Sequence, residues 1–493
     1  MQRRISSLIL SGLSIVLLGG CDGGGSGLAT DAPTASTRYD QQCAPNNPFV
    51  EDALSPTSTA SLDSEKQWVA AYLNEAYLWY AEIPSVDPTR PNYSSDANVP
   101  GSLQNYFDAL LTPATTPSGK LKDEFSFIFP TRLWNEFSEA GSELGYGMQL
   151  QFNATPPRNT RVVYVEGTSS AGDAGVARGQ RVVAADGVST ESGDSSDIDT
   201  LNAALFPASS GESHSFTFAR ADGSQFTATL TATEIIRNPV PQAKVLQSGG
   251  RAVGYLLFND HLATAEQPLI DAVTQFRDAG IEDLVLDLRY NGGGFLYIAS
   301  QLAYMIAGPE ATESRIFERL QFNDKRRGDQ SDFPFLACTS ERDLDCAGAT
   351  PLPTLNLQRV HVIATDGTCS ASEAIVNGLR GVDVEVRLIG GTTCGKPYGF
   401  TAKDNCGISY FPIEFAGVNA KGFGDYADGF TPDCATPDDL NRELGDPQEE
   451  MLATALNLQA GNACGSTKAL TQAAPLQRSP LRENRLLRPS AMP

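Results

Sequence analysis

The spacing of apolar residues changes twice along the chain and predicts three folded regions. In the first region apolar side chains recur at helical intervals, which predicts a mainly helical domain over residues 62–138. Ser64 and Gln67 form a capping box that would open its first helix. From Gly141 onward the interval becomes that of strands, so we expect a β-rich domain over residues 139–235.

The β-rich region contains two segments that resemble parts of a PDZ domain. Gly145, Tyr146 and Gly147 stand where that family has its carboxylate-binding loop, and residues 169–187 look like its helix and following strand. A hairpin whose tight turn begins at Asp222 completes the region. The resemblance implies that the loop offers consecutive backbone N–H groups to the terminal carboxylate of a peptide, which adds as a strand beside it.

Strands and helices alternate through the third region, residues 236–465. The apolar runs that predict buried strands are 252–258, 283–290, 359–365 and 384–390. Helices are predicted at 266–280, 295–308, 370–381 and 447–459. This alternation is typical of a largely parallel sheet with helices packed against it. We therefore expect a multidomain α+β protein whose last folded domain is of the α/β class.

The two ends of the chain differ in composition from the three regions between them. Residues 1–20 combine two arginines with an apolar stretch too short to span a bilayer, which predicts a secretion signal. Its Leu-Gly-Gly-Cys ending resembles the lipobox of bacterial lipoproteins, with an ordinary signal peptide as the alternative. Acylated Cys21 would anchor the protein to a bilayer of the cell envelope, facing the periplasm, with residues 21–61 as a flexible tether. Residues 466–493 have the composition of a disordered basic tail.

Charge and cysteine content narrow the classes of partner. The formal net charge of −23 argues against a nucleic acid held by phosphate contacts. Setting Cys21 aside leaves eight cysteines, and an even number in an exported protein indicates disulfides. We favour the local pairs Cys338–Cys346 and Cys394–Cys406. Because the sequence has no zinc-type spacing, we expect no metal. We also expect no other cofactor.

A serine and a lysine are the candidates for a reaction centre. Ser370 opens a helix directly after an apolar strand, and Lys396 lies just past the next strand. A serine nucleophile needs a base, yet His361 lies inside an apolar strand and no other histidine is better placed. A lysine can act as the base when burial lowers its pKa. Taken alone, Ser370 is most simply a helix N-cap. Cys369 and Cys394, which flank the pair, are interpreted as structural disulfide partners.

Backbone N–H groups near the serine predict an oxyanion hole. The N–H of Ala371 lies at the N-terminus of the predicted helix, where it is a ready hydrogen-bond donor. A second donor is expected from the glycine turn Asn291-Gly292-Gly293-Gly294, which follows another strand of the same predicted sheet. The carboxyl ends of parallel strands meet at one edge of a sheet, so the two turns are expected to be neighbours.

The combination of these motifs resembles the carboxyl-terminal processing proteases, also called tail-specific proteases. The resemblance covers residues 62–460 and is strongest over 284–400, where the glycine turn, the Ser-Ala-Ser-Glu helix start and the later Gly-Lys lie. It implies a catalytic domain of the ClpP/crotonase-like type, with Ser370 as nucleophile and Lys396 as general base. It also implies an oxyanion hole formed by Gly293 or Gly294 together with the N–H of Ala371. Glu373 matches an acidic residue that supports the site in some members of the family.

The resemblance also implies an activity and a substrate, namely a serine endopeptidase that cleaves exported proteins after recognising their C-terminal tail. One departure concerns Phe400, four residues after the lysine, where many members carry a glutamine that orients the lysine. This departure leaves a non-catalytic PDZ-bearing lipoprotein scaffold as the alternative. An acyl-transfer enzyme with an SxxK motif is excluded, because the third residue after Ser370 is Glu373 rather than lysine.

Overall fold

The computed structural model describes residues 35–153, 155–339, 346 and 348–464, and these residues belong to one compact unit. The predicted signal peptide, the acylation site at Cys21 and the basic tail lie outside the described residues. Within the described part of the chain, no helix combines the length and the apolar character needed to cross a bilayer.

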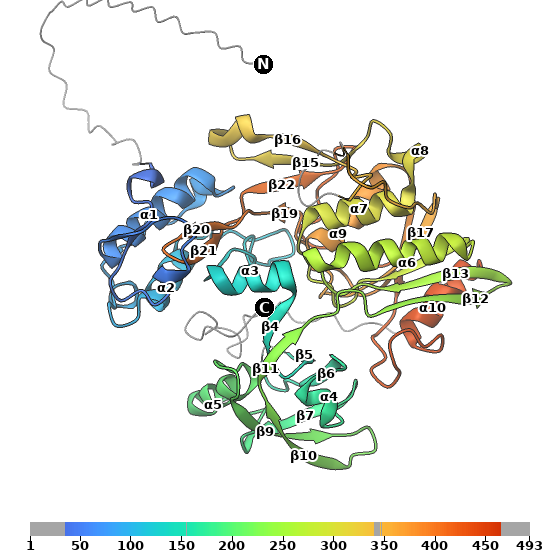
Figure 1. Ribbon diagram of the computed structural model, residues 1–493, viewed down its shortest axis with the longest axis horizontal. Helices are drawn as coiled ribbons and strands as arrows, with labels where there is room; N and C mark the ends of the chain where they lie inside the picture. The colour runs from blue at the N-terminus through green and yellow to red at the C-terminus, as the bar shows by residue number, and fades with distance from the viewer. Residues whose placement is uncertain (1–34, 154, 340–345, 347, 465–493) are drawn as a thin grey trace, which may run out of the picture. The chain divides into compact units, whose positions relative to one another are not determined.

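A six-stranded sheet forms the centre of the α/β region (Figure 1). Its strands in spatial order are β12 (Gln242–Ser248), β13 (Arg251–Leu257), β14 (Asp283–Asp287), β17 (Arg359–Ala364), β18 (Glu385–Gly390) and β23 (Cys434–Ala435). Only β12 and β13 pair in the antiparallel sense, and the other neighbours in this sheet run parallel. The prediction of a largely parallel sheet is confirmed.

Three helices pack on one face of this sheet and a fourth packs on the other. They are α6 (Glu266–Asp278), α7 (Leu296–Ala307), α9 (Ala371–Gly381) and α10 (Glu450–Gln459). Leu284 and Leu286 of β14 point into the core shared with α6, α7 and α9, which lie together in Figure 1, whereas Val285 joins the core with α10. Successive residues of a strand face opposite sides, so a sheet covered on both faces requires the continuous apolar run seen here.

A smaller sheet leads to the loop that carries the lysine. Its strands in spatial order are β16 (Ser331–Pro334), β15 (Ile316–Phe322), β22 (Phe415–Val418) and β19 (Tyr398–Gly399). The short helices of this region are α8 (Pro309–Thr312), η5 (Ala263–Ala265) and η6 (Asp324–Asp329). Because β19 begins two residues after Lys396, this sheet fixes one end of the lysine loop.

The N-terminal helical region shares a sheet and a core with the C-terminal half of the chain. Its helices are α1 (Leu62–Ala76), η3 (Tyr80–Glu82), η4 (Pro91–Tyr93), α2 (Val99–Ala109) and α3 (Thr131–Ala140). Its strand β3 (Phe127–Pro130) pairs with β21 (Ile408–Phe411), which in turn pairs with β20 (Lys403–Asn405). Tyr410 of β21 packs against Trp68 of α1, so the two regions form one continuous core there.

The start of α1 differs from the predicted capping box. The N-cap is Ser61, whose side chain accepts a hydrogen bond from the N–H of Ser64. Ser64 is therefore the third residue of the helix rather than its cap, and Gln67 lies beyond the first turn. Both serines fit the pattern of an N-cap, and packing of Leu62, which is buried, extends the helix by one turn.

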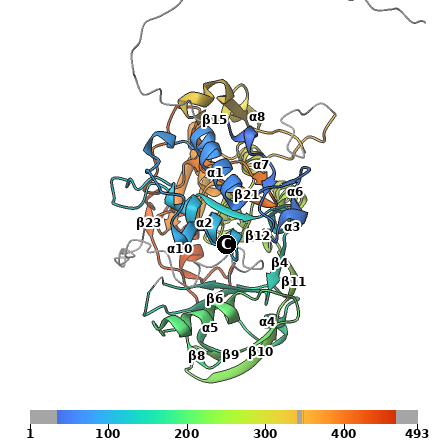
Figure 2. The same cartoon turned by 90° about the vertical axis from the view of Figure 1, so that its left-hand side faces the viewer.

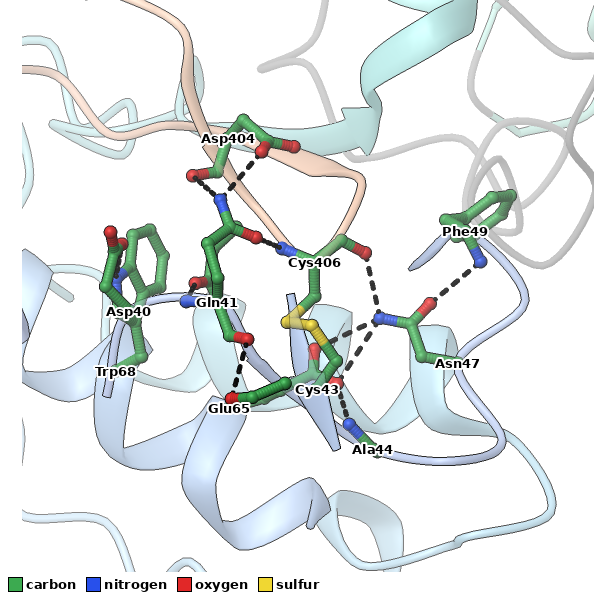
Figure 3. The surroundings of a disulfide bond; sticks show 12 residues. Asp40, Gln41, Cys43, Ala44, Asn47, Phe49, Glu65, Trp68, Asp404 and Cys406 are labelled. Atoms are coloured by element: carbon green, nitrogen blue, oxygen red, sulfur yellow. Dashed lines mark hydrogen bonds between the residues drawn. A yellow bond between two sulfur atoms is a disulfide. The ribbon is translucent and has the colours of Figure 1, made fainter. Parts of the chain in front are cut away.

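Residues 35–61, which the sequence predicted to be part of a flexible tether, are folded onto the rest of the unit. They form η1 (Ser36–Arg38), β1 (Gln42–Cys43), η2 (Val50–Asp52) and β2 (Ser58–Thr59). Cys43 forms a disulfide with Cys406, and Gln41 hydrogen-bonds Asp404 (Figure 3). The tether prediction is wrong here because composition reports only local periodicity, whereas this segment is held by partners 363 positions later in the chain.

Removal of the Cys43–Cys406 bond is expected to destabilise the protein more than removal of Cys338–Cys346. The first closes a separation of 363 residues and the second a separation of 8. In the chain-entropy model the longer loop constrains the unfolded chain more strongly, by about 3 kcal/mol for these two lengths. Denaturant unfolding of the two double alanine variants measures the difference. Equal losses of unfolding free energy would contradict the expectation.

Two further disulfides complete the set among the described residues. The predicted pair Cys338–Cys346 is confirmed, but the predicted pair Cys394–Cys406 is wrong. Cys394 pairs with Cys369. The fourth bond joins Cys434 and Cys464. The error arose because proximity in sequence does not indicate proximity in a fold whose neighbouring strands come from distant segments.

The β-rich region has its own sheet and its own core, and its strands lie together in Figure 2. The strands are β5 (Met148–Gln151), β6 (Arg161–Val165), β7 (Arg181–Ala185), β8 (Val188–Ser189), β9 (Ser213–Ala219) and β10 (Gln225–Thr231). The helices are α4 (Ser170–Asp173) and α5 (Ser195–Leu205). The strands β4 (Ser142–Gly145) and β11 (Thr233–Ile236), at its entry and exit, pair with each other. The predicted hairpin is confirmed as β9 and β10.

Arg178 of the β-rich region makes polar contacts with the loops that follow β14 and β23 of the parallel sheet. Its guanidinium donates to Asp438 at 2.6 Å and to the hydroxyl of Tyr290 at 2.5 Å. Tyr290 follows Arg289, whose fully buried guanidinium is paired with Asp287 and Glu449. The contact therefore ends on the residue that immediately precedes the glycine turn.

Candidate active site

Ser370 lies at a sharp turn between β17 and α9. It is the N-cap of α9 and has φ 54° and ψ −117°, a conformation that non-glycine residues seldom adopt. Holding a serine there costs on the order of 1–3 kcal/mol, which neighbouring contacts must offset. The half-buried side chain thus stands at the carboxyl edge of the parallel sheet, next to the N–H of Ala371 at the helix N-terminus, which donates to none of the described residues.

Glu373 ties the serine turn to the lysine loop. Its carboxylate is fully buried and accepts hydrogen bonds from the backbone N–H of Ser370 at 3.1 Å and of Lys396 at 2.8 Å. The N–H of Gly395 and the hydroxyl of Thr393 donate to its other oxygen. Burial raises the pKa of Glu373, and these four donors act in the opposite direction. One carboxylate therefore fixes both candidate catalytic residues.

Lys396 is buried, with an exposed fraction of 8%. Burial lowers the pKa of its amine to about 8, while the charges of Asp123 and Glu373 act in the opposite direction. The amine lies over the ring of Phe400, and no hydrogen bond joins it to Ser370 or to another of the described residues. The structure thus brings the two loops together through Glu373 rather than through direct contact between hydroxyl and amine.

A disulfide between Cys369 and Cys394 joins the same two loops. Cys369 directly precedes Ser370, and Cys394 lies two residues before Lys396. Their sulfur atoms and a carboxylate oxygen of Glu373 lie within 4.8 Å of one another. Because the two sulfurs are bonded to each other, they are not available as thiolate ligands in this form.

The glycine turn packs directly against the serine. A Cβ atom on Gly293 would lie 2.8 Å from the Cβ of Ser370 and 3.0 Å from the N of Ala371, and this glycine has φ 101°. Only glycine fits such a close approach. The N–H of Gly293 donates to Asn291 Oδ1, so it is engaged within the turn. The other predicted oxyanion donors are the N–H groups of Gly294 and Ala371, and they donate to none of the described residues.

His261 supports this turn, a role that the sequence did not indicate. Its backbone N–H donates to the carbonyl of Gly293, and its Nδ1 lies 2.9 Å from Asn291 Oδ1. Burial lowers the pKa of His261 to about 4, as it does for His361 in β17. Both rings are therefore neutral near pH 7, and neither is placed as a base for the serine.

The predicted peptide-binding loop lies between β4 and β5. Tyr146 is buried, and its hydroxyl donates to the carbonyl of Ala204 in α5. Gly147 has φ 77°. The carbonyls of Tyr146 and Gly147 accept hydrogen bonds, whereas their N–H groups donate to no residue of the described ranges. The loop therefore retains two consecutive backbone donors, beside the strand that starts at Met148.

Two residues of the N-terminal region complete the surroundings of the lysine. Phe125 has its ring 5.3 Å from the Lys396 amine, and Asp123 acts on it electrostatically. Neither residue carries a signal in the sequence that would assign it to the site. The nearest clue is the aromatic content of residues 125–129, which equally predicts an ordinary core strand.

Comparison with known proteins shows which family the chain is similar to. The model of Peptidase family S41 matches residues 252–404, and that of the Peptidase S41 N-terminal domain matches residues 64–127. The carboxyl-terminal-processing protease of Synechocystis sp. is 27% identical over 252 residues, which are 51% of this chain and 52% of that protein. That of Picosynechococcus sp. is 29% identical over 173 residues, 34% of this chain and 39% of that protein. The match thus spans about half the length of these relatives or less.

A solved structure shares the fold over most of the chain. The crystal structure of a putative S41 protease from Bacteroides fragilis has a TM-score of 0.58 and 22% identity, and the match covers 83% of this chain and 99% of that one. At this identity the likeness establishes the arrangement of the elements, and the chemistry must be argued from the residues themselves.

Proposed function

The chain belongs to peptidase family S41, the carboxyl-terminal processing protease family, and from this premise we propose that it is a serine endopeptidase with a Ser370/Lys396 dyad. The observation that supports the proposal most is the carboxylate of Glu373, which binds the backbone of both residues at once. A plain N-cap serine would need no such connection to a buried lysine.

The chemistry follows from the state of the lysine. With a pKa near 8, about a tenth of the Lys396 amines are neutral at pH 7. A neutral amine takes the proton from Ser370 Oγ, which adds to the scissile carbonyl carbon and gives a tetrahedral oxyanion. The oxyanion then collapses to the acyl-enzyme as the amide C–N bond breaks. The leaving amine takes the proton from the Lys396 ammonium. Water then hydrolyses the acyl-enzyme, with Lys396 again taking the proton from the attacking oxygen. The N–H groups of Ala371 and Gly294 stabilise the oxyanion. Ser370 and Lys396 share no hydrogen bond in this structure, and hydrogen bonds between catalytic groups commonly tighten when substrate binds.

The substrate is proposed to be an exported polypeptide that is recognised by its C-terminal tail. The two free donors of Tyr146 and Gly147 suit a terminal carboxylate, and the edge of β5 suits an added strand. The same proposal assigns PDZ-like binding of the polypeptide substrate to the β-rich region. It also includes anchoring of the protein at a cell-envelope bilayer through acylated Cys21, with the folded part facing the periplasm.

The competing function is an idle scaffold that binds C-terminal tails without cleaving them. Formation of an acyl-enzyme separates the two. We expect intact-mass spectrometry of the protein, mixed with an unfolded substrate bearing an apolar C-terminal tail, to detect an adduct equal in mass to the N-terminal product less one water. Peptide mapping should place the adduct on Ser370. Tail binding with neither adduct nor cleavage would favour the scaffold.

A further inference from the structure

We propose that Phe125 and Phe400 are positioning residues for the general base, holding the Lys396 amine between two aromatic rings and controlling its protonation. The inference rests on the proposed function, because it concerns the residue assigned there as the base. It also answers the question raised by Phe400, which stands where the family resemblance predicts a glutamine.

The geometry places the amine against both rings. Lys396 Nζ lies 4.1 Å from the centroid of Phe400 and 5.3 Å from that of Phe125, within the range of cation–π contact. No acceptor among the described residues takes a hydrogen bond from this amine, so its specific side-chain contacts are with the two rings. A flexible side chain with four rotatable bonds is thereby confined without an amide partner.

Other aromatic rings pack against Phe400 and fix its position. Its ring makes edge-on contacts with Phe411 at 5.4 Å and Phe127 at 5.6 Å, and these two rings stack at 4.4 Å. Phe127 and Phe411 are directly paired residues of β3 and β21. The N-terminal region therefore supports Phe400 through the sheet it shares with the C-terminal half.

Phe125 is held by the carboxylate of Asp123. The N–H groups of Phe125 and Ser126 donate to Asp123 Oδ1 at 3.0 and 2.9 Å. The hydroxyl of Tyr77 donates to Oδ2 at 2.7 Å. These bonds fix the turn before β3, so the ring of Phe125 is presented to the lysine loop from the opposite region of the chain.

Two effects of the rings act in opposite directions on the amine. Apolar rings exclude water, which disfavours the ammonium form, whereas the face of a ring attracts the ammonium. Charged and titratable groups on the surrounding elements add to these effects; they are Lys120, Asp123, Glu373, Tyr398, Asp425, Tyr426 and Asp428. Burial is the largest cause, and it lowers the pKa of Lys396 to about 8.

Two substitutions of Phe400 should therefore shift the titration of Lys396 in opposite directions. Phe400→Leu keeps most of the apolar volume but removes the aromatic face, so the pKa should fall by on the order of half to one unit. Phe400→Ala opens the site to water, so the pKa should rise toward the ordinary lysine value. Phe125→Leu should lower the pKa of Lys396 by a smaller amount, because Phe125 lies farther from the amine. It is the substitute test if a Phe400 variant does not fold.

The experiment is a 13C NMR titration of lysine Cε in the full chain, in the Ser370→Ala background, with the Lys396 signal assigned from Lys396→Arg. The pH profile of kcat/KM of the same Phe variants with Ser370 intact is the second measurement. In the wild type kcat/KM should rise about tenfold between pH 7 and 9, because the base must be neutral. Phe226→Leu is the control, since Arg220 lies over that ring, 4.2 Å from its centroid, in the β-rich region.

Opposite shifts for Phe400→Leu and Phe400→Ala, in both the titration and the acid limb of the rate profile, would support the inference. Unchanged titration, or shifts in the same direction as each other, would overturn it. A purely structural role would lower kcat without moving the acid limb. If the wild type cleaves nothing, the proposed function fails, yet the NMR titration still decides whether the rings control the lysine.

Discussion

Replacing Ser370 by alanine is expected to lower kcat/KM by at least about a thousandfold on an unfolded protein with an apolar C-terminal tail. Alanine removes the hydroxyl that is proposed to form the acyl-enzyme and leaves the other proposed site residues in place. The backbone N–H of residue 370 can still donate to Glu373, so the fold of the turn is retained. Cleavage should be followed by gel or mass spectrometry at equal concentrations of folded protein.

The matched control is Ser331→Ala in β16 of the same region, where the serine is exposed and outside the site. It should cleave at the wild-type rate. Tail binding should survive in both variants, because the proposed carboxylate loop lies in the β-rich region. Cleavage by Ser370→Ala at the wild-type rate would remove Ser370 from the mechanism, whatever the control does.

The sequence allowed much of the α/β region to be predicted because its signals are local. Buried strands such as β14 carry a short apolar run, here Leu284–Leu286, and the glycine turn follows shortly after this strand. Since parallel strands place their carboxyl ends at one edge, the proximity of Gly293 to Ser370 followed from the order of elements. The observed close approach of these two residues fits that expectation.

Other features depend on contacts between distant segments and carried no local signal. The Cys43–Cys406 bond joins a segment that composition alone assigned to a tether. The pairing of β3 with β21 places Phe125 beside Lys396, although the two residues lie in different predicted domains. The structure also gives Glu373 a larger role than the sequence suggested, because only the fold brings the loop with Gly395 to it.

The conservative substitution Glu373→Gln is expected to impair both stability and activity. Four donors converge on the two carboxylate oxygens: Thr393 and Gly395 on one, and Ser370 and Lys396 on the other. An amide offers one oxygen and one NH2 group, so one pair of donors would face another donor in a fully buried place. Leaving these groups unpaired should cost about 2–4 kcal/mol of unfolding free energy.

Activity should fall further than stability alone explains, because the lost bonds position the two residues of the proposed dyad relative to each other. A displacement on the order of 1 Å at such a site lowers kcat by about a hundredfold. Denaturant unfolding and kcat should be compared with those of Glu385→Gln, whose carboxylate on β18 is half exposed and paired with Arg387. That control should change either quantity little. If the two variants behaved alike, a single carboxylate joining the nucleophile to the base could not be the organising contact of the site.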